Sequence, residues 1–65
     1  MEDILRKAHD DNKVVEVIYT NTHKRRGKVF SIDRYGIVLE EEKIQNIQSR
    51  EKIAIPWTAI LEIRL

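Results

Sequence analysis

The chain has 65 residues and no cysteine, so any fold it adopts has a very small core and no disulfide bonds. A folded chain of this length buries only about 60% of the surface that its unfolded form exposes. Domains this small are usually stabilised by disulfides, by a metal or by association with another chain. We therefore expect one domain over residues 1–65, with either a tightly packed core or a partner chain.

Charge is distributed unevenly along the chain. The sequence is 42% hydrophobic and 35% charged with a formal net charge of +1, which is typical of a folded domain. Cations cluster at residues 24–28, whereas residues 40–42 are all glutamate. No apolar segment approaches the roughly 20 residues of a membrane span, and no signal-peptide pattern opens the chain. We expect a cytoplasmic protein with no membrane contact.

The N-terminal segment has apolar residues at helical spacing. Ile4, Leu5 and Ala8 predict a short helix over about residues 3–11, with Asp3 as the N-cap. A helix this short is unstable alone in water, so the side that carries Ile4 and Leu5 is expected to pack against another element.

The rest of the chain has the alternation of β-strands. We predict strands at about 13–20, 25–33, 35–42, 51–56 and 59–65, with "NTHK" as a hairpin turn and "KIQNIQSR" (43–50) as a further hairpin. Gly27 inside the second strand indicates a bulge or a bend where another backbone comes close. Short, bent antiparallel strands favour a small barrel.

Two of the predicted strands carry specific expectations about their faces. In the first strand, Val15, Val17 and Tyr19 share one face, while Ile18 lies on the other. In the closing strand, which follows a tight connector at Pro56, Ile60 is expected to lie opposite Leu61. This apolar strand would promote aggregation if nothing paired with it.

The order of these elements resembles the Sm-like fold, and in particular its bacterial branch, the host-factor-Q (Hfq) RNA chaperones. The first Sm motif of that branch is matched throughout, by Gly27, Val29, Ile32, Asp33, Tyr35, Ile37, Val38 and Leu39. The second motif, Tyr-Lys-His-Ala-Ile in the family, is matched only at its end, because the aligned residues are Pro56, Trp57, Thr58, Ala59 and Ile60. The resemblance covers nearly the whole chain.

The resemblance implies an SH3-like, ring-forming barrel of five strands with one N-terminal helix. Members of the family form rings of six or seven subunits in which the last strand pairs with the fourth strand of the next subunit. A homohexamer, favoured here over a heptamer, would join strands 51–56 and 59–65 of neighbouring subunits. Such a ring would also compensate for the small core and pair the apolar closing strand.

The resemblance places the basic cluster on the distal face, where the family binds adenine-rich RNA. Repeated around a ring, the cluster would form a phosphate-binding surface whose affinity falls steeply with salt. The alternative is a solvated hairpin turn that protects a strand edge. The predicted distal RNA-binding residues are Ile18, His23, Lys24, Arg25, Arg26 and Lys28.

The resemblance also implies a proximal site at the pore, with Tyr35, Trp57 and Thr58 as its residues. Tyr35 stands where the family stacks an aromatic ring on uridine; the alternative is a half-buried strand aromatic. Trp57 replaces the pore lysine and either stacks beside Tyr35 or packs between subunits. Because the family's lysine and histidine are absent, recognition of uridine-rich tails is not assured.

Two further positions carry expectations from the family. Its rim arginines, which anneal two RNAs, align with His9, Asp10, Asp11 and Asn12, so weak or no annealing activity is expected. The Asp33 carboxylate is expected to stabilise a turn by accepting backbone hydrogen bonds.

No pattern in the sequence indicates an enzyme. We find no nucleophile with a base, no glycine-rich phosphate loop and no spacing of His9 and His23 that indicates a metal or cofactor site. Two functions stay open: a single-stranded RNA-binding ring acting in post-transcriptional regulation, and a small β-barrel interaction or regulatory module without RNA binding.

Overall fold

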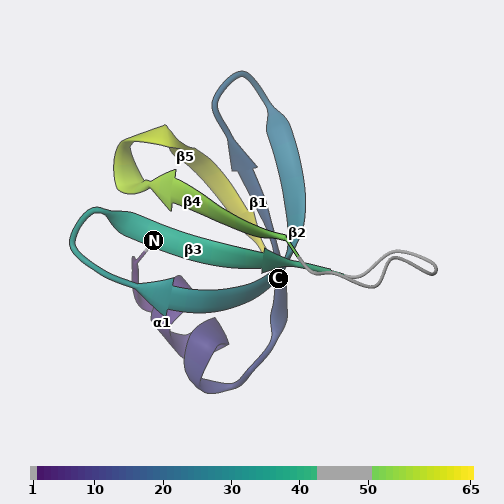
Figure 1. The fold of residues 1–65 in the computed structure, drawn as a ribbon, viewed down its shortest axis with the longest axis vertical. Coiled ribbons are helices and arrows are strands. Elements are labelled where there is room, and N and C mark those ends of the chain that lie inside the picture. The colour runs from purple at the N-terminus through teal and green to yellow at the C-terminus, as the bar shows by residue number, and fades with distance from the viewer. Residues whose placement is uncertain (1, 43–50) are drawn as a thin grey trace.

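The computed structural model describes residues 2–42 and 51–65, so the hairpin predicted at 43–50 lies outside the described residues. One helix precedes five strands, which form a single antiparallel sheet in the order β4-β3-β2-β1-β5 (Figure 1). The prediction of a mostly β chain with one N-terminal helix is confirmed. The elements are α1 (Glu2–Asp10), β1 (Val14–Tyr19), β2 (His23–Ile32), β3 (Gly36–Glu41), β4 (Lys52–Pro56), the 3₁₀ turn η1 (Trp57–Ala59) and β5 (Ile60–Arg64).

The helix packs on the sheet through Leu5, as predicted, but together with Ala8 and not with Ile4. Leu5 and Ala8 are buried, because residues three apart lie on the same face of a helix. Ile4 is 44% exposed, so the expectation that it packs beside Leu5 was wrong. The helix also begins at Glu2, which places Asp3 inside the first turn and not at the N-cap.

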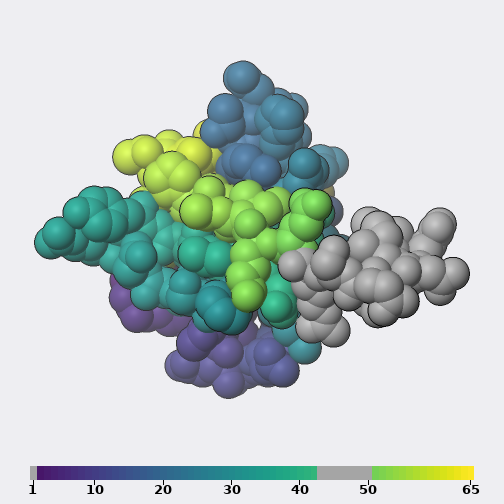
Figure 2. Space-filling model, in the orientation of Figure 1, coloured from purple at the N-terminus to yellow at the C-terminus, as the bar shows by residue number. Residues whose placement is uncertain are grey.

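The turn between β1 and β2 is shorter than predicted. Thr20, Asn21 and Thr22 all have positive φ angles, and this left-handed backbone reverses the chain within three residues. Pairing resumes at once, with Tyr19 opposite His23. His23 therefore begins β2 and does not belong to the turn, and the hairpin tip projects beyond β4 and β5 (Figures 1 and 2).

Strand β2 is bent at Gly27 and bulged at Phe30. Residues 23–28 pair with β1 and residues 27–32 with β3, so Gly27 belongs to both pairings. A Cβ at Gly27 would lie 2.1 Å from the Glu40 carbonyl oxygen, so the predicted close approach of another backbone is confirmed. Val29 pairs with Leu39 and Ser31 with Val38, leaving Phe30 as an extra residue.

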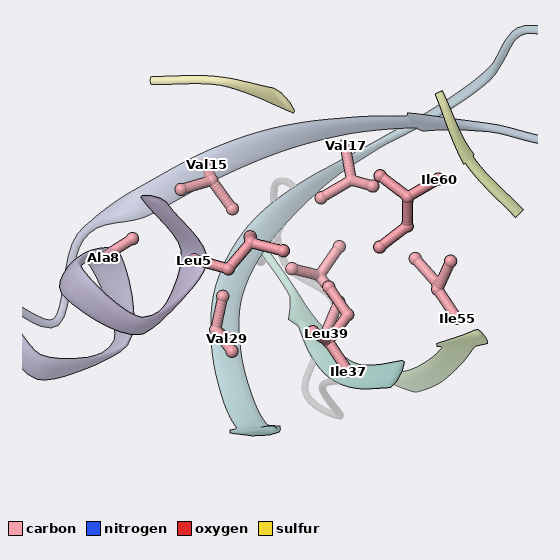
Figure 3. Packing of buried hydrophobic residues seen from close by; sticks show 9 residues of the cluster. All are labelled: Leu5, Ala8, Val15, Val17, Val29, Ile37, Leu39, Ile55 and Ile60. Carbon is pink, nitrogen blue, oxygen red and sulfur yellow. The ribbon is translucent and has the colours of Figure 1, made fainter. Parts of the chain in front are cut away.

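The core lies between α1 and the inner faces of all five strands. Leu5 and Ala8 point from the helix toward Val15 and Val29, and Ile55 and Ile60 lie at the opposite end (Figure 3). As predicted, Val15 and Val17 share the core face. The buried cluster is Leu5, Ala8, Val15, Val17, Val29, Ile37, Leu39, Ile55 and Ile60.

The closing strand does not follow the predicted alternation. Ile18 pairs with Glu62 but Tyr19 pairs with Ile60, so Leu61 is an extra residue in β5. This bulge puts Ile60 and Ile63 against the core and leaves Leu61 exposed.

The sheet is open at both sides. β4 pairs only with β3, and β5 only with β1, among the residues that the structure describes. Each of these strands therefore has one edge without a strand partner in that part of the chain, which is the arrangement that allows pairing with another chain.

Candidate nucleic-acid interface

The predicted distal residues divide between the two faces of the sheet. Lys24, Arg26 and Lys28 alternate on the outer face, the face opposite the core, because they pair with Ile18, Glu16 and Val14 of β1. His23 and Arg25 point to the other side of the sheet, where their register neighbours are Tyr19 and Val17. The structure therefore brings three of the five predicted cluster residues onto one surface.

Ile18 lies on this outer face but is covered. Its register neighbours are Lys24 on β2 and Glu62 on β5, and it is only 7% exposed. It is also separate from the core cluster. In this chain Ile18 offers little surface to a ligand, and it supports the side chains on either side of it.

Acidic side chains stand beside the outer-face cations and form what we call the charge ladder. Its three rows cross the sheet, and within each row a cation neighbours a carboxylate or an apolar side chain. Cations and carboxylates nearly balance, so the surface is not a continuous cationic one. The rows are Glu62, Ile18 and Lys24; Arg64, Glu16, Arg26 and Glu42; and Val14, Lys28, Glu40 and Lys52.

Two cations of the predicted cluster are paired with the acidic run. Arg26 Nε lies 3.0 Å from Glu42 Oε2, and the Glu42 amide donates to the Arg26 carbonyl oxygen at 2.8 Å. On the other face, Arg25 Nε lies 3.7 Å from Glu41 Oε2. An anionic ligand would compete with these carboxylates, so the cluster offers less free charge than its sequence indicates.

One further cation of the ladder is paired with a carboxylate. Arg64 Nε donates to Glu62 Oε2 at 2.7 Å. This hydrogen bond, together with the charges of Glu62 and Glu16, raises the pKa of the Arg64 guanidinium. The charge of Arg64 is therefore already balanced by nearby carboxylates.

Lys24 and His23 are the most available part of the cluster. Within residues 2–42 and 51–65, Lys24 forms no ion pair. The acid in its row of the ladder is Glu62, and Ile18 lies between the two. His23 is exposed, with its ring stacked on Tyr19 at a centroid distance of 6.0 Å. These two residues lie next to the projecting hairpin tip.

A second set of predicted residues meets at the turn between β2 and β3, residues 33–36, which we call the Asp33 turn. Asp33 Oδ1 accepts hydrogen bonds from the backbone N–H groups of Tyr35 at 2.8 Å and Gly36 at 3.1 Å. The predicted structural role of Asp33 is thereby confirmed. The Asp33 amide in turn donates to the Gly36 carbonyl oxygen at 3.0 Å.

Trp57 joins η1 to the Asp33 turn. Its indole N–H donates to the Asp33 carbonyl oxygen at 3.0 Å, and its backbone N–H donates to the Tyr35 carbonyl oxygen at 2.9 Å. The ring is half-buried and packs against the core. These contacts hold Trp57 against its own chain, and its packing between subunits stays a prediction. The neighbouring Thr58 is exposed.

Tyr35 is held at the surface by this turn and is 71% exposed. The Arg34 guanidinium carbon lies 5.0 Å from the centre of the Tyr35 ring, and Arg34 donates to the Tyr35 hydroxyl at 3.0 Å. The alternative of a half-buried strand aromatic is therefore wrong, and stacking on a base stays a prediction. An aromatic face beside a guanidinium can stack on a base and attract a phosphate.

The sequence reasoning missed a second exposed aromatic residue. Phe30 is 52% exposed, and Lys52 Nζ lies 4.3 Å from the centre of its ring. The signal was present: Gly27 and Val29 are on the core side, so alternation turns Phe30 outward. The pairing with Lys52 could not be found locally, because Lys52 lies two strands away.

The remaining predicted residues form no further site. His9, Asp10, Asp11 and Asn12 are exposed at the end of α1, and Lys7 pairs with Asp11 at 3.4 Å. In the described part of the chain, no group of three or more His, Cys, Asp or Glu side chains could hold a metal ion. The single helix there is too short and too polar to cross a membrane.

Comparison of the chain with family models, curated proteins and solved structures gives no match.

Proposed function

We propose that the chain is an Sm-like, SH3-like small-barrel domain that binds single-stranded RNA as a homo-oligomeric ring, a hexamer in preference to a heptamer. The observation that carries the proposal is the exposure of Tyr35, with Arg34 against its ring, on a turn held by Asp33 and Trp57. Unpaired bases are commonly bound by stacking on such rings, with roughly 1–3 kcal/mol per base.

The open edges of the sheet support assembly. β4 and β5 are the outermost strands; β5 carries exposed Leu61 and is followed by exposed Leu65. Pairing of β5 with β4 of the next subunit would satisfy both edges and bury this apolar surface. It would also enlarge a core that is small for an isolated chain.

The distal basic face contributes through its available cations. Because Arg25 and Arg26 are paired with glutamates, we assign most of the attraction to Lys24 near the hairpin tip, with the exposed His23 ring beside it. One pair per subunit, repeated around a ring, still makes a surface that can contact phosphates along A-rich RNA. The acidic end of α1 makes annealing of two RNAs weak or absent, and we place the ring in the cytoplasm.

A second candidate function is favoured by the charge ladder. Intramolecular pairing of cations with carboxylates is what a surface requires when it has no anionic ligand. A small β-barrel interaction or regulatory module without RNA binding would therefore account for the outer face, with the open strand edges as its docking surfaces.

Two measurements separate these functions. Light scattering coupled to size-exclusion chromatography is expected to give the mass of six subunits at micromolar concentration, and a monomer or dimer would contradict the ring. Fluorescence anisotropy with 15-nucleotide oligo-A and oligo-U is then expected to show binding that weakens with salt, with oligo-A bound more tightly.

Single substitutions identify the residues that contact the RNA. Tyr35→Ala and Lys24→Gln are each expected to reduce affinity, whereas Lys7→Gln, a matched change on α1, should not. A ring that binds neither oligonucleotide would contradict RNA binding and favour the interaction module.

A further inference from the structure

We propose that the outer face of β3 and β4 is a further RNA contact, in which two aromatic rings with their own cations bind bases of one strand. This inference rests on the proposed RNA binding and adds a site to it. The surface contains a hollow of about 160 Å³, which we call the outer groove. Its lining includes Tyr35, Gly36, Val38, Ala54 and Pro56.

An aromatic ring with a cation against it lies at one end of the outer groove, and a second such pair lies beyond the other end. At the first, Arg34 lies 5.0 Å from the centre of the Tyr35 ring, and Tyr35 lines the groove. Beyond the other end, two residues from Ala54 along β4, Lys52 lies 4.3 Å from the centre of the Phe30 ring. Both rings are more than half exposed, so neither is needed to fill the core. An exposed ring with a cation against it offers a stacking surface and a phosphate contact together.

The strand register places both pairs on one surface. Along β4, residues 52, 54 and 56 alternate to the same side, and they pair with residues 40, 38 and 36 of β3. Strand alternation turns Phe30 outward, and its ring lies against Lys52 of β4, across β3. The hollow follows the same residues from Val38 and Ala54 to Gly36 and Pro56.

The side chains of the outer groove favour a nucleic acid strand over a peptide. Gly36 and Ala54 have little or no side chain, so the base of the groove is not filled. Arg34 and Lys52 attract negative charge on either side of it. The two acids nearby are already engaged: Asp33 accepts two backbone hydrogen bonds, and Glu40 is the register neighbour of both Lys28 and Lys52. A polyanion with flat, apolar bases matches this surface.

The spacing of the two ring–cation pairs constrains which bases they bind. Lys52 pairs with Glu40 and Pro56 with Gly36, so positions 52 and 56 are four residues apart along β4, roughly 13 Å. This is about four times the 3.4 Å rise between stacked bases of one strand. We therefore expect the two rings to bind nucleotides that are not adjacent in the RNA.

The experiment measures anisotropy of a fluorescein-labelled oligo-A 15-mer with the full chain at several salt concentrations. Phe30→Ala is expected to weaken binding by about five-fold or more, as expected for loss of one stacked base. Phe30→Leu, which keeps an apolar side chain without a flat ring, should weaken it similarly, and Phe30→Trp should restore it. Lys52→Gln should reduce the slope of log affinity against log salt concentration by about one for each phosphate contact that is lost.

Controls keep the outcomes separate. Ile4→Ala removes a similarly exposed apolar side chain from α1 and should change nothing. Circular dichroism and light scattering establish that each variant is folded and assembled, and Phe30→Leu and Phe30→Trp serve if Phe30→Ala is unfolded.

Each result has a defined meaning. Absence of binding by the unmodified chain would overturn the proposed function and this site with it. Binding that Tyr35→Ala weakens but the Phe30 and Lys52 variants do not would overturn the outer groove alone and leave that face to a protein partner. Binding retained by Phe30→Leu but lost by Phe30→Ala would replace base stacking with an apolar contact and overturn the proposal.

Discussion

Arg26 on β2 and Glu42, just beyond β3, are sixteen residues apart in the sequence and form an ion pair of 3.0 Å on the outer face of the sheet. The pair joins the basic cluster to the acidic run. These two segments have opposite charge and are far apart in the sequence, but the hairpin of β2 and β3 places them side by side. The balance of positive and negative charge on this surface therefore depends on the register in which β2 pairs with β3.

Glu42→Gln is expected to increase RNA affinity and to steepen its salt dependence. The change removes a competing carboxylate and frees Arg26 to contact a phosphate. The slope of log affinity against log salt concentration should therefore steepen by up to about one, for one added phosphate contact per subunit. Because both side chains are about half exposed, the loss of stability should stay below about 1 kcal/mol. Anisotropy titrations across salt concentrations measure the change in affinity, and urea denaturation measures the change in stability.

The matched control is Glu2→Gln, which breaks an exposed pair with Arg6 on α1. An equal gain in RNA affinity from that variant would show a general effect of charge.

Gly27→Ala is expected to destabilise the fold by roughly 1–3 kcal/mol or more. A Cβ at this position would lie 2.1 Å from the Glu40 carbonyl oxygen, and a backbone atom cannot move aside as a flexible side chain can. Urea denaturation measures the cost as a lower midpoint with an unchanged slope. Thr58→Ala, at an exposed position, should leave the midpoint where it was. An unaltered midpoint in Gly27→Ala would mean that β2 and β3 separate at this point in solution.

Asp33→Ala is expected to cost about 1–3 kcal/mol and to loosen the corner that holds Trp57. The variant leaves the backbone N–H groups of Tyr35 and Gly36 without their acceptor. Because Trp57 donates to the Asp33 carbonyl oxygen, its fluorescence should shift toward that of a more exposed indole. Asp33→Asn keeps a side-chain oxygen and should recover part of the stability. Equal losses in both variants would indicate that the negative charge, and not the acceptor, is what matters.

Thr22→Gly is expected to stabilise the chain by about 0.5–1 kcal/mol. Thr22 has a φ of 66°, a left-handed conformation that a β-branched residue adopts at a cost and glycine adopts freely. The greater flexibility of glycine in the unfolded chain offsets part of the gain. Thermal denaturation should show a higher midpoint. Thr58→Gly, outside the left-handed turn, is the control and should not stabilise; a lower midpoint for Thr22→Gly would mean that the Thr22 hydroxyl contact to the Asn21 carbonyl oxygen outweighs the strain.

Local patterns in the sequence were sufficient for the helix, for the five strands and for the close approach at Gly27. The spacing of apolar residues differs between a helix and a strand, so it indicates which of the two a segment forms. A glycine within a strand indicates a close contact that leaves no room for a side chain. The role of Asp33 could also be anticipated, because an Asx turn involves only its own neighbours along the chain.

Only the tertiary structure decided which side chains face one another across the sheet. A bulge at Leu61 altered the alternation in β5, and pairing of β3 with both β2 and β4 placed the Phe30 ring against Lys52. Pairing of β2 with β3 joined Arg26 to Glu42 and reduced the charge of the predicted basic surface. Each of these relationships depends on register, which is set by packing between strands distant in sequence, and a periodic pattern within one strand contains no information about that register.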